Sequence, residues 1–228
     1  MDYKLKYLKY KRKYLDLVKE STRGYYDNIS KGKINKHNFQ DSQIGGQNIS
    51  NNSKIKKGLD YAKKLVGIKY GTTIKPPLED SGPFWNKDGP PPSMQEIKKG
   101  GLACVGVTNL IRRYLGLKIP TDTGKWKYIF PGGTGAWFQY LKSKKTLVKI
   151  DYYKTYPKGT LLLEMWNPKN MGHVAIVWTE NKKGLSHSKI LHSRHDGPKS
   201  VIIESLDDYK MKRRFTHICL PENWLAKN

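Results

Sequence analysis

The spacing of apolar residues changes along the chain, from a helical period in the first half to strand-like runs in the second. Residues 100–120 predict a helix whose apolar and aromatic positions recur at steps of three and four: Val107, Leu110, Ile111, Tyr114 and Leu115. Gly116 is placed to end this helix, and Pro120 follows it. The helix therefore has one apolar face that a core can cover.

Two further helices are predicted, one between a possible N-cap at Ser53 and an end at Gly67, the other over residues 134–144. Strand-like apolar segments then follow at 146–153, 159–166, 173–179, 189–193, 200–206 and 214–220. Because helices precede strands, the order favours an α+β domain with helices packed on an antiparallel sheet.

The chain divides into three regions by composition. Residues 1–20 are basic and predict an amphipathic leader helix. One face of this helix is formed by four tyrosines and a leucine: Tyr3, Tyr7, Tyr10, Tyr14 and Leu17. Residues 21–53 are rich in Asn, Ser and Gly and predict a flexible linker. Residues 54–228 form the predicted folded domain. Within it, six prolines between 72 and 99 predict an irregular loop, in which Phe84 and Trp85 either line a cleft or fill the core.

Charge and composition narrow the classes of partner and compartment. The 228 residues carry a formal net charge of +24, which predicts attraction to an anionic polymer, nucleic acid or a membrane surface through the leader. The alternative is a lysine-rich surface that only maintains solubility. No apolar run predicts an integral membrane segment, and no signal peptide is recognisable, so we expect a soluble protein. Two cysteines are too few for a disulfide framework and favour a reducing compartment such as the cytoplasm.

Cys104 lies where the central helix is predicted to begin. Free backbone N–H groups and the helix dipole favour a negative charge at that position, and a thiolate carries one. A cysteine so placed can act as a nucleophile if a histidine reaches it. A cysteine in a helix is also commonly a buried core residue.

Two of the six histidines occupy strand ends. His173 begins the segment 173–179, and His192 lies near the end of 189–193. If these strands pair, both imidazoles lie at one end of the sheet. If the helix that begins at Cys104 lies across that end, His173 can accept the proton of Cys104 and His192 can orient His173. His187 and His195 fall in predicted turns and are weaker candidates.

A metal site is not predicted. His217 and Cys219 share one face of the last strand, but two ligands are too few for a metal and no further cluster supports one. Cys219 is expected in the core, and we expect no cofactor.

The order of several motifs resembles the NlpC/P60 superfamily of papain-like cysteine peptidases. These motifs are GLACVGVTNLIRRYLGLKIPTDTGKW, GTLLLEMW with MGHVAIVW, and KILHSRHDGPKSVIIESL, preceded by AKKLVGIKYG. The resemblance spans residues 55–207. It implies a papain-like fold with Cys104 as nucleophile, His173 as base and His192 as the orienting residue. Tyr70 matches a family tyrosine near the nucleophile and is implied as a substrate or oxyanion contact.

The chain departs from the family at the nucleophile. The family usually has Asp before the cysteine and Ser-Gly after it, and this chain has Ala103 and Val105-Gly106. Members of the family mostly hydrolyse amide bonds in bacterial cell-wall peptides, and the Asp and Ser help to bind the charged ends of these peptides. Their absence weakens the case for a cell-wall peptide as the substrate here. The leader separately resembles the Lys- and Tyr-rich starts of many proteins of mimivirus-type giant viruses, which would place the protein in a host cytoplasm or a virion.

Three functions stay open on the sequence. The favoured one is a thiol hydrolase that cleaves an amide bond of a peptide through Cys104, His173 and His192. The second is a thiol acyltransferase or lipase that acts on lipid, with an acyl-facing wall formed by Phe84, Trp85 and Trp126. The third is a non-catalytic basic protein that binds nucleic acid or virion components on the same fold.

Overall fold

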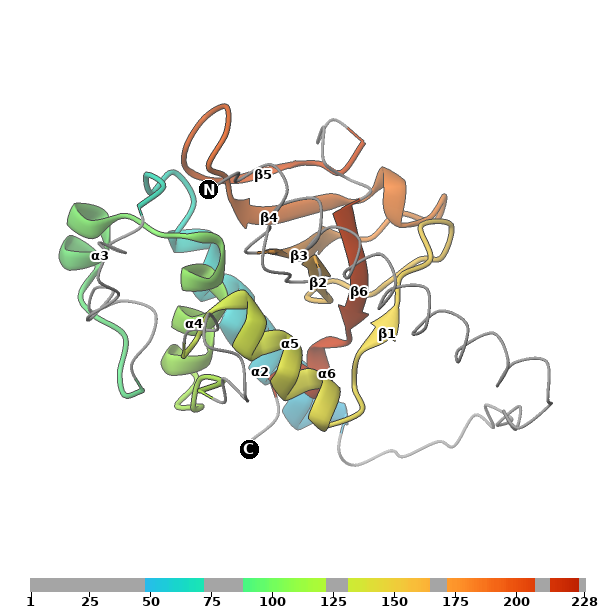
Figure 1. The fold of residues 1–228 in the computed structure, drawn as a ribbon, viewed down its shortest axis with the longest axis horizontal. Coiled ribbons are helices and arrows are strands. Elements are labelled where there is room, and N and C mark those ends of the chain that lie inside the picture. Colours follow the sequence, from blue (N-terminus) through green and yellow to red (C-terminus); the bar gives the residue numbers. More distant parts are fainter. Residues whose placement is uncertain (1–47, 72–87, 122–130, 165–171, 208–213, 226–228) are drawn as a thin grey trace, which may run out of the picture. The chain divides into compact units, whose positions relative to one another are not determined.

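The structure is a computed structural model that describes residues 48–71, 88–121, 131–164, 172–207 and 214–225. These residues form an α+β fold (Figure 1). Its helices are α2 (Asn48–Lys64), α3 (Met94–Gly100), α4 (Cys104–Tyr114), α5 (Thr134–Ser143) and α6 (Pro221–Trp224). Its strands are β1 (Val148–Lys149), β2 (Leu161–Glu164), β3 (His173–Thr179), β4 (Lys189–Ser193), β5 (Val201–Ser205) and β6 (Phe215–Cys219). The predicted α+β class is confirmed at this level.

The six strands form one antiparallel sheet in the order β1-β6-β2-β3-β4-β5. Strands β3 and β4 are neighbours, with Ile176 opposite Leu191. Strand β5 lies on the far side of β4 and places Ile202 opposite His192. The histidine-bearing strands are therefore adjacent, and β5 lies next to the second histidine.

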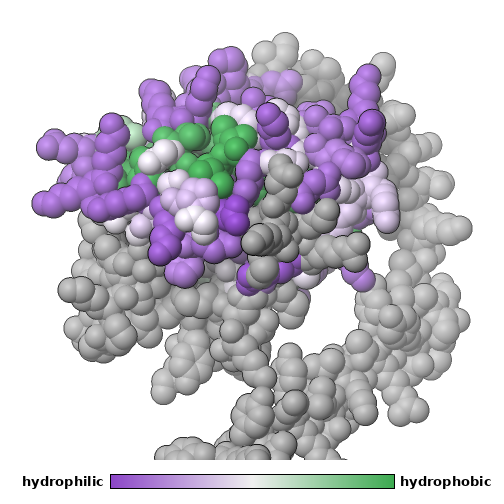
Figure 2. Space-filling view, turned by 90° about the horizontal axis from the view of Figure 1, so that it is seen from above, coloured by the Kyte–Doolittle hydropathy of each residue, from purple (hydrophilic) through white to green (hydrophobic). Residues whose placement is uncertain are grey.

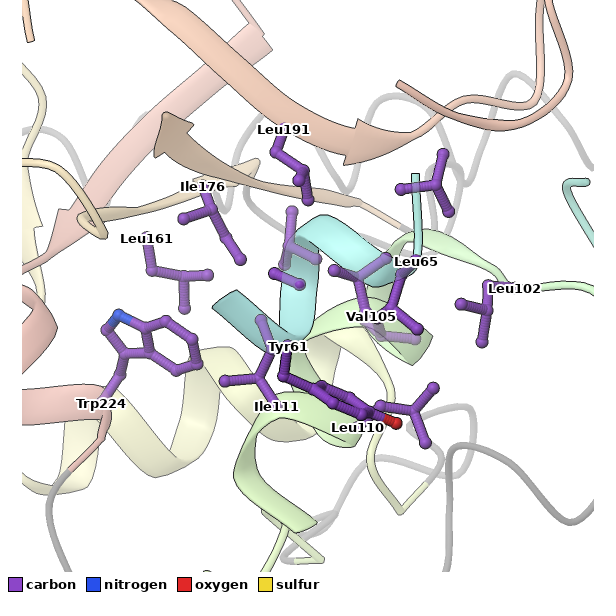
Figure 3. Close-up of a cluster of buried hydrophobic side chains, with 14 of the residues drawn as sticks. Tyr61, Leu65, Leu102, Val105, Leu110, Ile111, Leu161, Ile176, Leu191 and Trp224 are labelled. Atoms are coloured by element: carbon purple, nitrogen blue, oxygen red, sulfur yellow. The ribbon is translucent and has the colours of Figure 1, made fainter. Parts of the chain in front are cut away.

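Helices α2 and α4 pack on one face of the sheet, and Figure 3 shows the side chains that fill the space between them. The helices contribute Tyr61, Leu65, Val105, Leu110 and Ile111, and the strands contribute Leu161, Ile176 and Leu191. All of these are buried. Burying one such aliphatic side chain contributes roughly 2 kcal/mol, so this layer holds α4 firmly against β3 and β4.

The other face of the sheet carries a second, smaller core. Alternate strand residues such as Leu162, Ala175 and Ile190 point to this side, because successive side chains of a strand point to opposite faces. Tyr156 and Leu185 from the connecting segments cover them. Both faces of the central strands are thus buried.

Two predicted boundaries are wrong. Helix α2 begins at Asn48, inside the predicted linker, so Ser53 is not its N-cap. The predicted irregular loop over 72–99 contains α3 at its end, where Ser93 and Glu96 form a capping box. Residues 72–87 lie outside the described part of the chain.

The remaining elements follow the pattern more closely. Strands β3 and β4 have the predicted bounds, and Gly116, with φ of 68°, follows α4. The predicted strand over 146–153 is reduced to Val148 and Lys149, which pair only with β6 at the sheet edge. The residues after it cross the second face, where Ile150 and Tyr152 pack on the smaller core.

The surface in Figure 2 is mainly hydrophilic around one small hydrophobic area. This agrees with the high lysine content of the chain. Over the described ranges, none of the helices has the length and apolar character that a bilayer crossing requires.

Candidate active site

Cys104 is the first residue of α4, and Ala103 precedes it as an extended N-cap. The backbone just before it is tied to β4, because the hydroxyl of Ser193 donates a hydrogen bond of 2.5 Å to the carbonyl oxygen of Leu102. Ser193 directly follows His192 in β4. The start of the cysteine helix is therefore fixed beside the strand end that carries the second histidine.

The Cys104 thiol lies against the first residues of β3. Hydrogen bonds from the backbone N–H groups of Val174 and Val105 and from the side chain of Thr134 act on the sulfur and lower its pKa. Burial has the larger, opposite effect and raises the pKa of Cys104 above its ordinary value. The resting group is therefore a thiol, and not the thiolate that its place at a helix N-terminus predicts.

The two predicted histidines are in direct contact. His173 Nε2 lies 2.8 Å from His192 Nδ1, and the rings meet edge to face at an interplanar angle of 79°. His192 is buried, whereas His173 is half-buried. Since Val174 directly follows His173, the chain brings the imidazole pair and the Cys104 thiol to the same end of β3.

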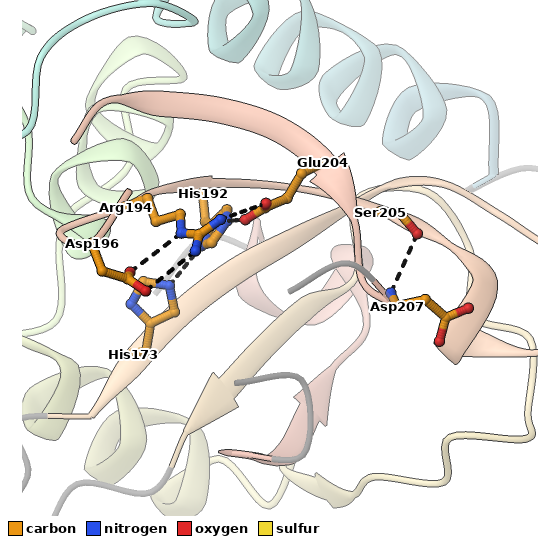
Figure 4. A network of polar contacts seen from close by, with 7 residues as sticks. All are labelled: His173, His192, Arg194, Asp196, Glu204, Ser205 and Asp207. Carbon is orange, nitrogen blue, oxygen red and sulfur yellow. Dashed lines mark hydrogen bonds and ion pairs between the residues drawn. The ribbon is translucent and has the colours of Figure 1, made fainter. Parts of the chain in front are cut away.

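A carboxylate and a guanidinium continue this line of side chains (Figure 4). His192 Nε2 lies 2.6 Å from Oε1 of Glu204 on β5, and Arg194 Nη1 donates to Glu204 Oε2 at 2.7 Å. Arg194 also pairs with Asp196, which is more exposed. We call the set His173, His192, Glu204 and Arg194 the polar chain.

His173 is held in its neutral form. Burial lowers its pKa to about 3, and the neighbouring His192 ring and the positive charge of Arg214 lower it further. Arg214 pairs with Glu164 at 2.6 Å, and Glu164 lies opposite His173 in the sheet register. A neutral imidazole can accept a proton, so His173 is in the state that a general base requires.

Tyr70 is held beside Cys104 by the backbone around it. Its N–H donates to the carbonyl of Lys199 at 2.6 Å, and the next residue, Gly71, lies directly against Gly101. A Cβ on Gly101, whose φ is 79°, would lie 2.9 Å from the Gly71 Cα, so glycine is required at this crossing. Burial raises the pKa of Tyr70 to about 12, and proximity to Cys104 adds to the effect. The phenol therefore stays protonated and can donate a hydrogen bond.

Thr134 is a site residue that sequence reasoning missed. It begins α5, so a second helix N-terminus approaches Cys104 beside that of α4. Gly172 permits this approach, because a Cβ there would lie 2.8 Å from the Thr134 methyl group. The sequence signal was the Gly132-Gly133 pair directly before the predicted helix that Thr134 begins.

Asn109 holds the start of α5 from within α4. Its side-chain amide donates to the carbonyl of Gly132 at 2.8 Å, and its carbonyl oxygen accepts from the indole N–H of Trp137 at 2.7 Å. Asn109 and Trp137 are fully buried. A buried, satisfied amide of this kind fixes the relative position of the two helices.

The other candidates make different contacts or lie outside the described ranges. His187 pairs with Asp207 at 2.7 Å, and His195 packs edge-on against Tyr70. Cys219 is buried in the main core, as predicted. Phe84, Trp85 and Trp126 lie outside the described residues, as does the leader. Where side chains are described, no three His, Cys, Asp or Glu residues are grouped as a metal site requires.

No protein-family model matches the sequence, and no curated protein matches it significantly. The resemblance to the NlpC/P60 superfamily therefore stays a prediction, and the case for function depends on the geometry of the site.

Proposed function

We propose that the protein is a thiol hydrolase that cleaves an amide bond, with Cys104 as nucleophile, His173 as general base and His192 as the residue that orients His173. The observation that carries the proposal is the contact between His173 and His192 next to the strand residue whose N–H meets the Cys104 sulfur. Nucleophile, base and orienting group in this order define a catalytic triad on any fold.

The chemistry begins with a neutral pair. As the Cys104 sulfur attacks the substrate carbonyl, its proton passes to the His173 ring, and a C–S bond forms. The oxyanion that results can be stabilised by the Cys104 N–H and the Tyr70 hydroxyl, each worth on the order of 3 kcal/mol. The C–N bond then breaks while His173 returns the proton to the leaving amine. Water, activated by His173, hydrolyses the thioester and regenerates the thiol.

The neutral resting state suits this use of a base. A thiolate–imidazolium pair requires a cysteine pKa below the histidine pKa. Burial acts against this, because it raises the pKa of Cys104 and lowers the pKa of His173. Proton transfer must therefore accompany the attack, and the position of the His173 ring becomes decisive.

The first experiment compares amide and ester substrates in one background. We expect the Cys219→Ser protein to hydrolyse members of a panel of acyl peptides and peptide amides, and the additional Cys104→Ser change to abolish hydrolysis. Cleavage of acyl esters alone would support the acyltransferase or lipase alternative. Equal turnover with and without Cys104 would contradict the proposal.

A second candidate, a basic binding protein, has one observation in its favour, the net charge of +24. A basic surface binds nucleic acid with an affinity that falls steeply as salt increases. If this is the function, DNA or RNA binding will show that salt dependence and will not change when Cys104 is replaced. Hydrolysis will then be undetectable in both proteins.

A further inference from the structure

Glu204 lies within the polar chain, between His192 and Arg194. Its position follows from the sheet register, because Glu204 lies opposite Ile190 on β4 and thus diagonal to His192 on the same face. One carboxylate oxygen meets His192 Nε2 at 2.6 Å, and the other accepts from Arg194 at 2.7 Å. Both oxygens therefore act as hydrogen-bond acceptors.

We infer that Glu204, held in place by Arg194, is a positioning residue that sets the tautomers of His192 and His173 and thereby makes Nδ1 of His173 the proton acceptor. This inference rests on the proposed function only for its effect on catalysis. The tautomers themselves can be measured without any substrate.

The inference follows from counting protons along the contacts. A carboxylate oxygen that accepts requires a proton on His192 Nε2. His192 is neutral, because burial lowers its pKa although Glu204 acts in the opposite direction, so its Nδ1 then carries a lone pair. That lone pair at 2.8 Å requires a proton on His173 Nε2. In neutral His173 the second nitrogen, Nδ1, must then carry a lone pair, which is what a general base needs.

Because Arg194 can only donate hydrogen bonds, the tautomers of His192 and His173 should respond when one carboxylate oxygen of Glu204 is replaced by an NH2 group. In a Glu204→Gln protein the amide NH2 cannot face Arg194, because both groups are donors. The amide oxygen must take that side, and the NH2 then points at His192 Nε2. That nitrogen becomes the acceptor, the proton moves to His192 Nδ1, and the His173 proton is forced onto Nδ1. The base is blocked although every side chain keeps its place.

The other charged groups near the imidazoles, Arg214, Glu164 and Asp196, do not fix the tautomers of His192 and His173 in the way that Glu204 does. Arg214 faces His173 from the β6 side and is a donor only, and its partner Glu164 accepts from it. Asp196 accepts from Arg194 and so holds the guanidinium from the other side. Among these contacts, only the one from Glu204 reaches the far nitrogen of His192.

The test uses histidine labelled with 15N in the Cys219→Ser background, with His173 signals assigned by comparison with His173→Gln. We expect Nε2 of His173 protonated and Nδ1 unprotonated, and the reverse in Glu204→Gln. The rate of Cys104 alkylation by iodoacetamide at pH 7 should fall by roughly 100-fold, since general-base assistance is worth about 10² or more. A wrong tautomer in a serine protease triad costs about 10⁴.

A second substitution should reverse the effect. In Glu204→Gln/Arg194→Met the donor that orients the amide is gone, so the amide oxygen can turn to His192 and restore the tautomers. We expect His173 Nδ1 to be unprotonated again and alkylation to return to within about tenfold of the parent. Asp207→Asn is the matched control, because it makes the same carboxylate-to-amide change beside a different histidine, His187.

The outcomes separate this inference from the proposed function. If the same His173 nitrogen carries the proton in the parent and in Glu204→Gln, the inference is wrong. The same holds if Arg194→Met fails to restore the tautomers. If the tautomers reverse but alkylation and hydrolysis do not change, the inference on Glu204 stands and the proposed use of His173 as base is wrong.

Discussion

The two cysteines of this chain occupy opposite kinds of environment. Cys104 begins a helix, is half-buried and receives hydrogen bonds at its sulfur from Val174 and Thr134. Cys219 ends a strand, is fully buried in the main core, and its sulfur lies 3.7 Å from the carbonyl oxygen of Leu220. Burial raises the pKa of both, to about 12 for Cys219.

The comparison shows that a raised pKa does not by itself distinguish a core cysteine from a nucleophile. What differs is the chemistry of the neighbours. The surroundings of Cys219 are mainly the apolar core, with Thr146 as its side-chain hydrogen-bond partner. Cys104 lies at the end of the sheet where a neutral histidine pair and a carboxylate meet. A core cysteine fills volume, whereas Cys104 lies at the same end of β3 as groups that can accept and return a proton.

The largest expected effect is a difference between the two cysteines in alkylation and in their importance for hydrolysis. Iodoacetamide should modify the Cys219→Ser protein at one site, and Cys104→Ser should not be modified while folded. Hydrolytic activity should fall below detection in Cys104→Ser and stay within about twofold in Cys219→Ser. Peptide mass spectrometry after labelling locates the modified residue. Labelling of Cys219 in the native protein would contradict the comparison.

The second effect concerns the ionisation of Cys104. Because its pKa is raised, we expect no thiolate absorbance at pH 7, with the thiolate appearing only above the ordinary thiol pKa of about 8.5. The measurement is the ultraviolet difference spectrum between Cys219→Ser and the double serine variant across pH. A thiolate already present at pH 5–7 would show that the site rests as an ion pair.

A third effect is loss of stability in acid. Unfolded His173 binds a proton below its ordinary pKa of 6.5, and the folded protein does not until about pH 3. The unfolded state therefore binds more protons in this window, so stability falls as pH drops from 6.5 towards 3. Between pH 7 and pH 4 we expect the parent to lose on the order of 3 kcal/mol more than His173→Gln.

Denaturant unfolding of both proteins at the two pH values measures this difference. His192 and Arg214 raise the cost of protonating His173, so both must be retained in the comparison. Identical losses in the two proteins would show that His173 is not held neutral by the fold.

The smallest effect tests Thr134. Thr134→Val keeps the shape of the side chain but removes the hydroxyl that hydrogen-bonds to Cys104. A net hydrogen bond of about 1 kcal/mol corresponds to a reduction of roughly fivefold in the alkylation rate at pH 7. Stability should change little. An unchanged rate would assign Thr134 a packing role only.

Local pattern predicted the elements that place Cys104 and the two histidines. The helical spacing from Val107 to Leu115 predicts α4, and the run after Gly172 predicts β3 with His173 as its first residue. These features depend on neighbours within a few positions of the chain, which a sequence displays directly.

The parts that were missed depend on pairing between distant segments. Glu204 becomes a partner of His192 only through the register of β4 with β5, although an acidic residue within the apolar segment 200–206 was a signal. Thr134 reaches Cys104 only because Asn109 holds the start of α5. The expected thiolate at the helix N-terminus was wrong for a similar reason. Burial raises the pKa of Cys104, and this burial comes from segments that are distant in the sequence.

The most direct test of the central claim is the alkylation rate of Cys104 at pH 7 in Cys219→Ser, with and without His173→Gln. If His173 accepts the proton of Cys104, the second-order rate constant should fall by roughly 100-fold, because only the small free thiolate fraction then reacts. Circular dichroism should confirm that both proteins are folded. Equal rate constants in the two folded proteins would contradict the assignment of His173 as the base for Cys104.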